Sequence, residues 1–109
     1  MKLIEKKCVP CEGGIPPMSE REEDQYIKEI SGWTLDREGT HNIKKDFKFK
    51  NFKKAMNFVN NVADVAEQEG HHPDICIRYN KVNLELYTHA IGGLHENDFI
   101  LAAKINQLE

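Results

Sequence analysis

Residues 51–70 read NFKKAMNFVNNVADVAEQEG, and this stretch decides the fold. Apolar side chains recur in it at spacings of three and four residues, the period of one helix face. The members of this stripe are Phe52, Ala55, Met56, Val59, Val62, Ala63 and Ala66. Asn51 can cap the first turn, and Gly70 is a natural residue just past the last turn. We therefore predict a helix over 52–69 whose apolar stripe packs into the core.

Strand patterns flank this helix on both sides. Before it, Trp33 and Leu35 alternate with polar neighbours, Glu38-Gly39 offers a turn, and Ile43, Phe47 and Phe49 fall on one parity. After it come Ile75, Ile77 and Tyr79 on one parity, a turn at Asn80-Lys81, and Val82, Leu84, Leu86 and Thr88 on one parity. Because alternation with a period of two marks a half-buried strand, we predict two antiparallel hairpins.

Two further helices complete the pattern. Ser19-x-x-Glu22 is a capping box that opens a helix with Tyr26, Ile27 and Ile30 inward, ended by Ser31-Gly32. A last helix starts near Glu96 and turns Phe99, Ile100, Ala103 and Ile105 or Leu108 inward. The order is therefore α-β-β-α-β-β-α. It predicts a two-layer α+β fold over residues 19–109, with three helices on one face of a four-stranded antiparallel sheet.

Composition limits the class of protein. The chain has 109 residues, enough for one domain, and a net charge of −3 gives no basic field for nucleic acid. We expect no membrane association, because no apolar run approaches the roughly 18 residues of a membrane span. The first residues lack the apolar segment of a secretory signal. The chain has three cysteines, an odd number that cannot form a complete set of disulfides. These features predict a cytoplasmic chain in a reducing compartment.

The first 18 residues contain Cys8-x2-Cys11 among prolines and glycines. The pair could be half of a zinc site or a redox pair. Zinc needs two more ligands, and Cys76 is the one other cysteine, while no strand pattern precedes the pair as in thioredoxin-like sites. The favoured interpretation of residues 1–18 is an irregular surface tail with free thiols.

Three of the five histidines are expected to converge. His71-His72-Pro73-Asp74 follows Gly70, and His89 ends the second strand of a hairpin that folds back toward them. Three imidazoles could hold zinc, although adjacent histidines point in different directions in most backbones. Metal-free acid–base chemistry also fits, because imidazole titrates near neutrality and a helix C-terminus favours His71 as a proton donor. Histidines at loop ends without a function remain a third interpretation.

The pattern Glu67-x3-His71-His72-Pro73-x5-Tyr79-x9-His89-x8-Asp98 resembles the signature of pterin-4a-carbinolamine dehydratases. The resemblance extends from Ser19 to Ala103. It implies a fold of three helices on one side of a four-stranded antiparallel sheet, and assembly as a homodimer or homotetramer. It also implies dehydration of a 4a-hydroxytetrahydropterin, the product of aromatic amino-acid hydroxylases, to the quinonoid dihydropterin. Pterin would be the substrate, and no metal or other cofactor would be needed.

By this resemblance His71, His72 and His89 would be the catalytic residues: His71 and His89 would form the acid–base pair, and His72 would bind or orient the pterin and could share in proton transfer. Gly70, Tyr87, Thr88 and Ala90 would line the pocket. Glu67 lies one helical turn before His71 and could orient that imidazole. Asp98 is expected chiefly as a capping carboxylate of the last helix.

Three positions depart from the family pattern. Gly70 and Ala90 stand where acidic or amide side chains are frequent, and His95 stands where Ser or Thr usually caps the last helix. We expect these changes to alter affinity rather than to abolish activity, and we expect a weaker cap at His95.

Other functions stay open. Some animal members of the family are dimerisation cofactors for a transcription factor, and related bacterial proteins could act in another pterin or molybdopterin pathway. Six lysines lie at positions 44, 45, 48, 50, 53 and 54, a local basic stretch. Because they alternate with core-type residues, we interpret them as a solvated face and not as a nucleic-acid site.

Overall fold

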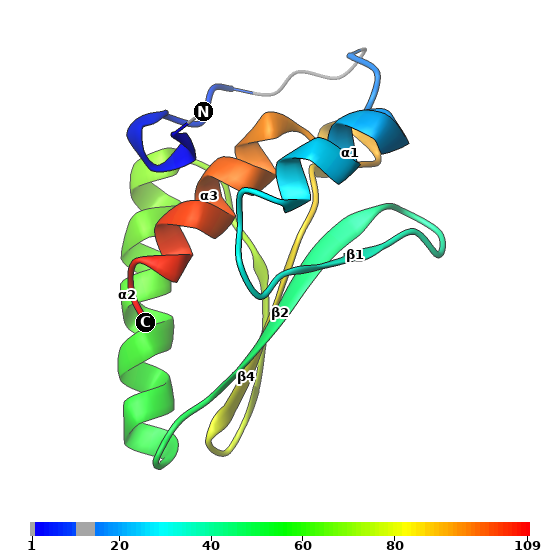
Figure 1. The fold of residues 1–109 in the computed structure, drawn as a ribbon. Coiled ribbons are helices and arrows are strands. Elements are labelled where there is room, and N and C mark those ends of the chain that lie inside the picture. Colours follow the sequence, from blue (N-terminus) through cyan, green and yellow to red (C-terminus); the bar gives the residue numbers. More distant parts are fainter. Residues whose placement is uncertain (1, 11–14) are drawn as a thin grey trace.

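The computed structural model describes residues 2–10 and 15–109. The elements in chain order are α1 (Glu20–Ile27), β1 (Thr34–Asp36), β2 (Asn42–Lys48), α2 (Phe52–Glu69), β3 (Asp74–Arg78), β4 (Lys81–Leu86) and α3 (Glu96–Asn106). Short 3-10 turns lie at Leu3–Glu5 and His89–Ile91. The predicted order and α+β class are confirmed (Figure 1).

The four strands form one antiparallel sheet in the order β1-β2-β4-β3. Its inner face carries buried Ile43, Phe47, Val82, Leu84 and Leu86, which pack with the helices in one core. Figure 1 shows α2 running along the strands, while α1 and α3 lie away from the turn between β3 and β4. Since side chains alternate, the outer face carries the polar residues between these. Among the described residues no helix combines the length and apolar character that a membrane crossing needs.

Helix α2 has the predicted bounds because both of its caps are local. Asn51 Oδ1 accepts a hydrogen bond from Lys54 N, and Gly70 takes the left-handed conformation at φ 66°. The predicted stripe is wrong at its edges, because Phe52 and Ala63 are exposed. Phe58 is buried instead, and its ring lies 4.6 Å from that of Phe47.

The second hairpin turns one residue earlier than predicted. Arg78 pairs with Lys81, so Tyr79 and Asn80 form the turn. Tyr79 adopts φ 51° and its side chain is exposed. Asn80 Nδ2 donates to Phe49 O at 2.9 Å, and Phe49 N donates to Asn80 O. These bonds to the end of β2 place Asn80 inside the turn and leave Lys81 to open β4.

Residues 2–10, part of the tail that we expected over residues 1–18, have no regular secondary structure apart from the 3-10 turn at Leu3–Glu5, but they pack on the domain. Leu3 is 3% exposed and joins the core, so burial of its side chain anchors the segment. Lys6 Nζ pairs with Glu96 at 2.9 Å, and Cys8 N donates to Glu69 Oε1 at 2.9 Å. The segment therefore lies against the ends of α2 and α3. Cys11 lies outside the described residues.

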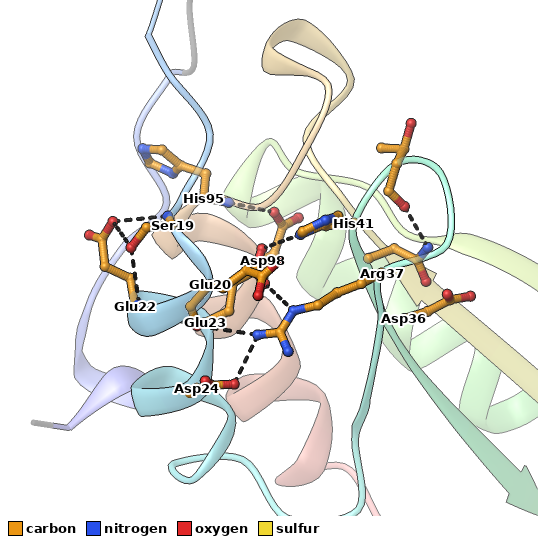
Figure 2. Close-up of polar contacts among 12 residues, drawn as sticks. Ser19, Glu20, Glu22, Glu23, Asp24, Asp36, Arg37, His41, His95 and Asp98 are labelled. Carbon is orange, nitrogen blue, oxygen red and sulfur yellow. Dashed lines mark hydrogen bonds and ion pairs between the residues drawn. The ribbon is translucent and has the colours of Figure 1, made fainter.

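The capping box of α1 is confirmed: Ser19 Oγ accepts from Glu22 N, and Glu22 Oε1 accepts from Ser19 N. The helix ends at Ile27, and Ile30 is buried in the turn beyond it. Glu23, an acidic residue in the first turn of this helix, is fully buried. It accepts bonds from Arg37 Nε at 2.9 Å and pairs with His41 Nδ1 at 2.8 Å (Figure 2). This ion cluster ties α1 to the β1–β2 connection.

Candidate active site

A cleft of about 310 Å³ gathers the residues that the sequence singled out. Its lining includes every predicted catalytic and substrate-binding residue: Gly70, His71, His72, Tyr87, Thr88, His89 and Ala90. Val9, Pro73, Asp74 and Asn97 also line it. The predicted convergence of three histidines is therefore present in the structure.

Two chain reversals bring these residues together. Gly70 ends α2 in the left-handed conformation, which only glycine adopts without strain, and His71 N donates to Ala66 O at 3.2 Å. On the opposite side Thr88 bridges to Gly93, so His89 leads a 3-10 turn just past β4. The His89 side chain is exposed, and its ring centroid lies 4.1 Å from that of Tyr87. Each histidine thus stands on a short, fixed loop.

His71 is held by a buried carboxylate. Asp98 Oδ1 lies 2.6 Å from His71 Nε2, and Asp98 is fully buried. Asp98 Oδ2 accepts from Thr88 Oγ1 at 2.9 Å and from His95 N at 3.0 Å, the latter bond drawn in Figure 2. Asp98 therefore caps α3, as expected, and also orients His71. Because Nε2 faces the carboxylate, Nδ1 is the ring nitrogen that remains for a ligand.

Glu67 does not orient His71, contrary to our expectation. Its carboxylate lies 2.5 Å from His72 Nε2. The Glu67 and His72 side chains are 76% and 60% exposed, so solvent screens this pair. The expectation was wrong because Glu67 and His71, four residues apart, would share a face only if the helix continued past Gly70. The left-handed turn at Gly70 breaks the helical period and directs His71 toward α3.

His95 caps α3 through its side chain, and the expectation that this cap is weaker than one made by Ser or Thr stays a prediction. Its Nδ1 accepts a hydrogen bond from Asn97 N at 3.1 Å, the part that Ser or Thr would play. An imidazole with an unprotonated nitrogen can accept such a bond, so the substitution preserves the start of α3.

The N-terminal segment contributes one wall of the cleft. Asn97 is 2% exposed, and its side-chain amide bonds both backbone groups of Val9. Val9 N donates to Asn97 Oδ1 at 3.0 Å, and Asn97 Nδ2 donates to Val9 O at 2.7 Å. Sequence reasoning missed Val9 and Asn97. Their bond joins residues 88 positions apart, and neither residue belongs to a periodic or motif signal.

Cys8 lies beside this wall with a deactivated thiol. Burial, followed by the negative charge of Glu69, raises the pKa of Cys8 to about 12. A redox or metal-binding thiol needs the opposite shift, because the thiolate is the reactive form. Within residues 2–10 and 15–109, no three His, Cys, Asp or Glu side chains are grouped so that they could hold a metal ion.

The cleft brings together three imidazoles that can take part in proton transfer. His71 is held by a carboxylate, His89 is exposed with its ring tilted against that of Tyr87, and His72 is exposed. Imidazoles are suited to donate and accept protons near neutral pH.

Comparisons with known proteins point to one family. A family model described as pterin 4 alpha carbinolamine dehydratase matches residues 16–108. Proteins with the name "Putative pterin-4-alpha-carbinolamine dehydratase" are similar over nearly the whole chain. The one from Halorhodospira halophila is 48% identical over 108 residues, covering 99% of this chain and 98% of the relative. The one from Rickettsia canadensis is 50% identical over 104 residues, covering 94% of both.

Two solved structures share the fold. One is described as a transcriptional coactivator/pterin dehydratase from Brucella melitensis. It has a TM-score of 0.79 and 33% identity, and the match covers 84% of this chain and 97% of that one. The other is described as a pterin dehydratase-like protein that is a RuBisCO assembly factor in the alpha-carboxysome. Its TM-score is 0.61 at 23% identity, over 71% of this chain and 88% of that one, which shows a common fold.

Proposed function

The chain belongs to the pterin-4-alpha-carbinolamine dehydratase family, and from this premise we propose that its histidine cleft dehydrates a 4a-hydroxytetrahydropterin. The product would be the quinonoid dihydropterin, and the role would be recycling of tetrahydropterin. The observation that carries the proposal is the cleft that joins His71, His72 and His89, with His71 held on buried Asp98.

The reaction needs two proton transfers. The C4a–O bond breaks as a general acid protonates the hydroxyl, which leaves as water. The N5–H proton passes to a general base, and the N5 lone pair forms the C4a=N5 double bond. One proton is given and one is taken, so exchange with solvent restores both groups. General acid–base catalysis supplies roughly 10²- to 10⁴-fold, which suits a substrate already inclined to lose water.

The proposed roles follow from the geometry of each imidazole. His71, oriented through Nε2 by Asp98, donates from Nδ1 to the departing hydroxyl. His89, on the opposite loop, accepts the N5 proton. His72 lies at the exposed rim and orients the pterin. Asp98 is a positioning residue, because its contact is with His71.

The flat ring would bind largely through backbone groups. Gly70 and Ala90 offer no polar side chain to the cleft, so peptide groups there and at Tyr87 and Thr88 are the donors and acceptors. A ligand that hydrogen-bonds to peptide groups can still bind although Gly70 and Ala90 lack the polar side chains that are frequent in the family. We therefore expect weaker substrate affinity and not loss of turnover.

A coupled assay tests the proposal. A phenylalanine hydroxylase generates the 4a-hydroxytetrahydropterin, and the absorbance of the quinonoid product reports dehydration. We expect wild type to accelerate the reaction, His71→Ala and His89→Ala to lose about 10² to 10⁴ of the rate, and His72→Ala mainly to raise KM. His95→Ser is the matched control, because His95 is not in the lining of the cleft and serine preserves the cap. No acceleration by folded wild type would overturn the proposal.

The same assay tests the proposed independence from cofactors. We propose that neither a metal nor a redox group takes part and that pterin enters as substrate. The wild-type rate should then survive treatment with a chelator. A rate that collapses after chelation and returns with added zinc would contradict it.

The setting of the reaction is also a proposal. We propose a homodimer or homotetramer in the cytoplasm, without nucleic-acid or membrane partners, that serves an aromatic amino-acid hydroxylase. Sedimentation would give the assembly state, and loss of hydroxylase turnover on depletion of this protein would support the link.

A second candidate function is protein binding. The similar Brucella melitensis protein is described as a transcriptional coactivator as well as a pterin dehydratase. A partner that is retained equally by wild type and by His71→Ala would support this role. Turnover of other pterins, including molybdopterin precursors, is tested by offering them in the same assay.

A further inference from the structure

A second cavity lies away from the histidines. It has a volume of about 480 Å³ and is lined by Asp46, Phe47, Lys48, Cys76, Arg78, Lys81, Val82 and Asn83. Phe47 and Val82 turn their side chains to the core, so they present their backbone here. The rest of the lining belongs to the outer face of the sheet. The cavity is thus built on the helix-free side of β2, β4 and β3.

Three cations form one row across this surface. Lys48 pairs directly with Lys81, and Lys81 pairs directly with Arg78, so the row crosses three neighbouring strands. Directly opposed side chains on one face lie about 5 Å apart at Cβ, and like charges in this arrangement are destabilising. Among residues 2–10 and 15–109, no carboxylate lies within 4.0 Å of these three side chains. The single carboxylate of the lining, Asp46, instead accepts from Asn83 Nδ2 at 2.8 Å.

The neighbouring lysines of the same strand are neutralised. Lys44, on the same outer face, lies 2.8 Å from Asp36 and 3.3 Å from Glu85. Lys45, on the inner face, pairs with Glu109 at 2.6 Å. Lys44 and Lys45 are therefore engaged in ion pairs. Among the described residues, the basic side chains of the strands that have no such pair are Lys48, Lys81 and Arg78, which form a compact group. A compact group fits a small anion, whereas a polyanion needs a continuous basic track.

We propose that the row of Lys48, Lys81 and Arg78 binds a phosphate group, either free phosphate or the phosphate of a small organic ester. The Arg78 guanidinium can bind two phosphate oxygens at once, and the two lysines add point charges around the third. The volume exceeds that of one phosphate and falls in the range of small-molecule sites, which leaves room for an organic group.

This site is separate from the histidine cleft. The cleft includes Asp74, the first residue of β3, whereas Arg78 is the last residue of that strand. At 3.3 Å per residue, about 13 Å of strand lies between them. A ligand in the row therefore leaves the proposed catalytic residues free.

Amide NMR titrations with sodium phosphate and with glycerol phosphate, at constant ionic strength, test the proposal. We expect saturable shifts at Cys76, Lys81 and Asn83 with either ligand. The ligand with the lower Kd shows whether the site is specific for free phosphate or for a phosphate ester. Arg78→Gln should weaken binding about tenfold or more, because a charged bidentate contact is lost. Lys44→Gln is the matched control on the same face and should bind as wild type does. Both variants change exposed or half-exposed side chains, and their amide spectra verify the fold.

Several outcomes would overturn the proposal. Shifts that never saturate, equal affinity in Arg78→Gln, or shifts centred on His71 and His89 would each do so. A short single-stranded oligonucleotide that binds far more tightly than glycerol phosphate would also do so, since it would indicate a polyanion surface. Dehydratase activity measured with saturating phosphate should be unchanged, and competition with the pterin would count against a separate site.

Discussion

Asp98 Oδ1 lies 2.6 Å from His71 Nε2, and this contact links the capping of α3 to the proposed chemistry. The same carboxylate accepts bonds from Thr88 Oγ1 and His95 N through its other oxygen. One fully buried carboxylate therefore connects the loop after α2, the residues just after β4 and the first turn of α3. Removing its charge should alter stability and catalysis together.

The variant Asp98→Asn keeps the shape and removes the charge. We expect kcat and kcat/KM to fall together by about 10- to 100-fold, less than for loss of the imidazole, because His71 is still present but poorly oriented. Steady-state kinetics give this result. Nitrogen chemical shifts of His71 should also change, since the amide can no longer hold the same tautomer. A lower melting temperature with unchanged His71 shifts and kcat would make Asp98 purely structural.

Glu67→Gln provides the contrast. The Glu67–His72 pair is mostly exposed, and exposed pairs contribute about 0 to 1 kcal/mol. We expect the melting temperature and kcat to remain close to wild type, with at most a small rise in KM. Thermal denaturation and the coupled assay measure both. A loss as large as that of Asp98→Asn would show that Glu67 acts on the chemistry after all.

Local signals in the sequence predicted the helices and the histidine cleft well. Asn51 and Gly70 fix both ends of α2 by contacts within one turn, and the spacing of His71 to His89 follows from one hairpin. Non-local pairs gave no such signal. Val9 and Asn97 bond across 88 positions, so neither was predicted to line the cleft.

The buried carboxylate in α1 was missed for a different reason. Acidic residues in a first helical turn interact well with the helix dipole from the surface, so Glu23 looked ordinary. Its burial depends on Arg37 and His41, which the β1–β2 connection brings over α1. Only the packing of that connection reveals the cluster.

Glu23→Ala should therefore be strongly destabilising. The substitution removes a fully buried charge and leaves Arg37 Nε and His41 Nδ1 without their partner. Loss of hydrogen bonds to a charged group costs about 1.5 to 3 kcal/mol, and chemical denaturation measures the loss. Asp24→Ala is the matched control, because that carboxylate binds the same guanidinium but is 59% exposed. Equal, small effects in both variants would contradict the role given to Glu23.

Asn97→Ala tests the wall of the cleft. The substitution removes both bonds to the Val9 backbone, and we expect KM to rise several-fold at nearly constant kcat, because binding and not proton transfer depends on the wall. Alkylation of Cys8, followed by mass spectrometry, should accelerate as the thiol loses its burial. Asn97→Asp keeps an acceptor for Val9 N and should show a smaller effect. Unchanged KM and unchanged alkylation in Asn97→Ala would refute this role.

The attachment of residues 2–10 should weaken in acid. Burial raises the pKa of Glu69, but the bonds from Lys104 Nζ and Cys8 N outweigh it and hold that pKa below its usual 4.5. A carboxyl group with a lowered folded-state pKa stabilises the fold above its unfolded-state pKa, and this contribution is lost as the pH falls through the folded value. We therefore expect hydrogen exchange at the Cys8 amide to show full protection above pH 4.5 and loss of protection below it, after correction for intrinsic rates. In Glu69→Gln the protection should be weaker at neutral pH and should change little over that range. Protection in wild type that stays constant well below pH 4.5 would show that another contact holds the segment.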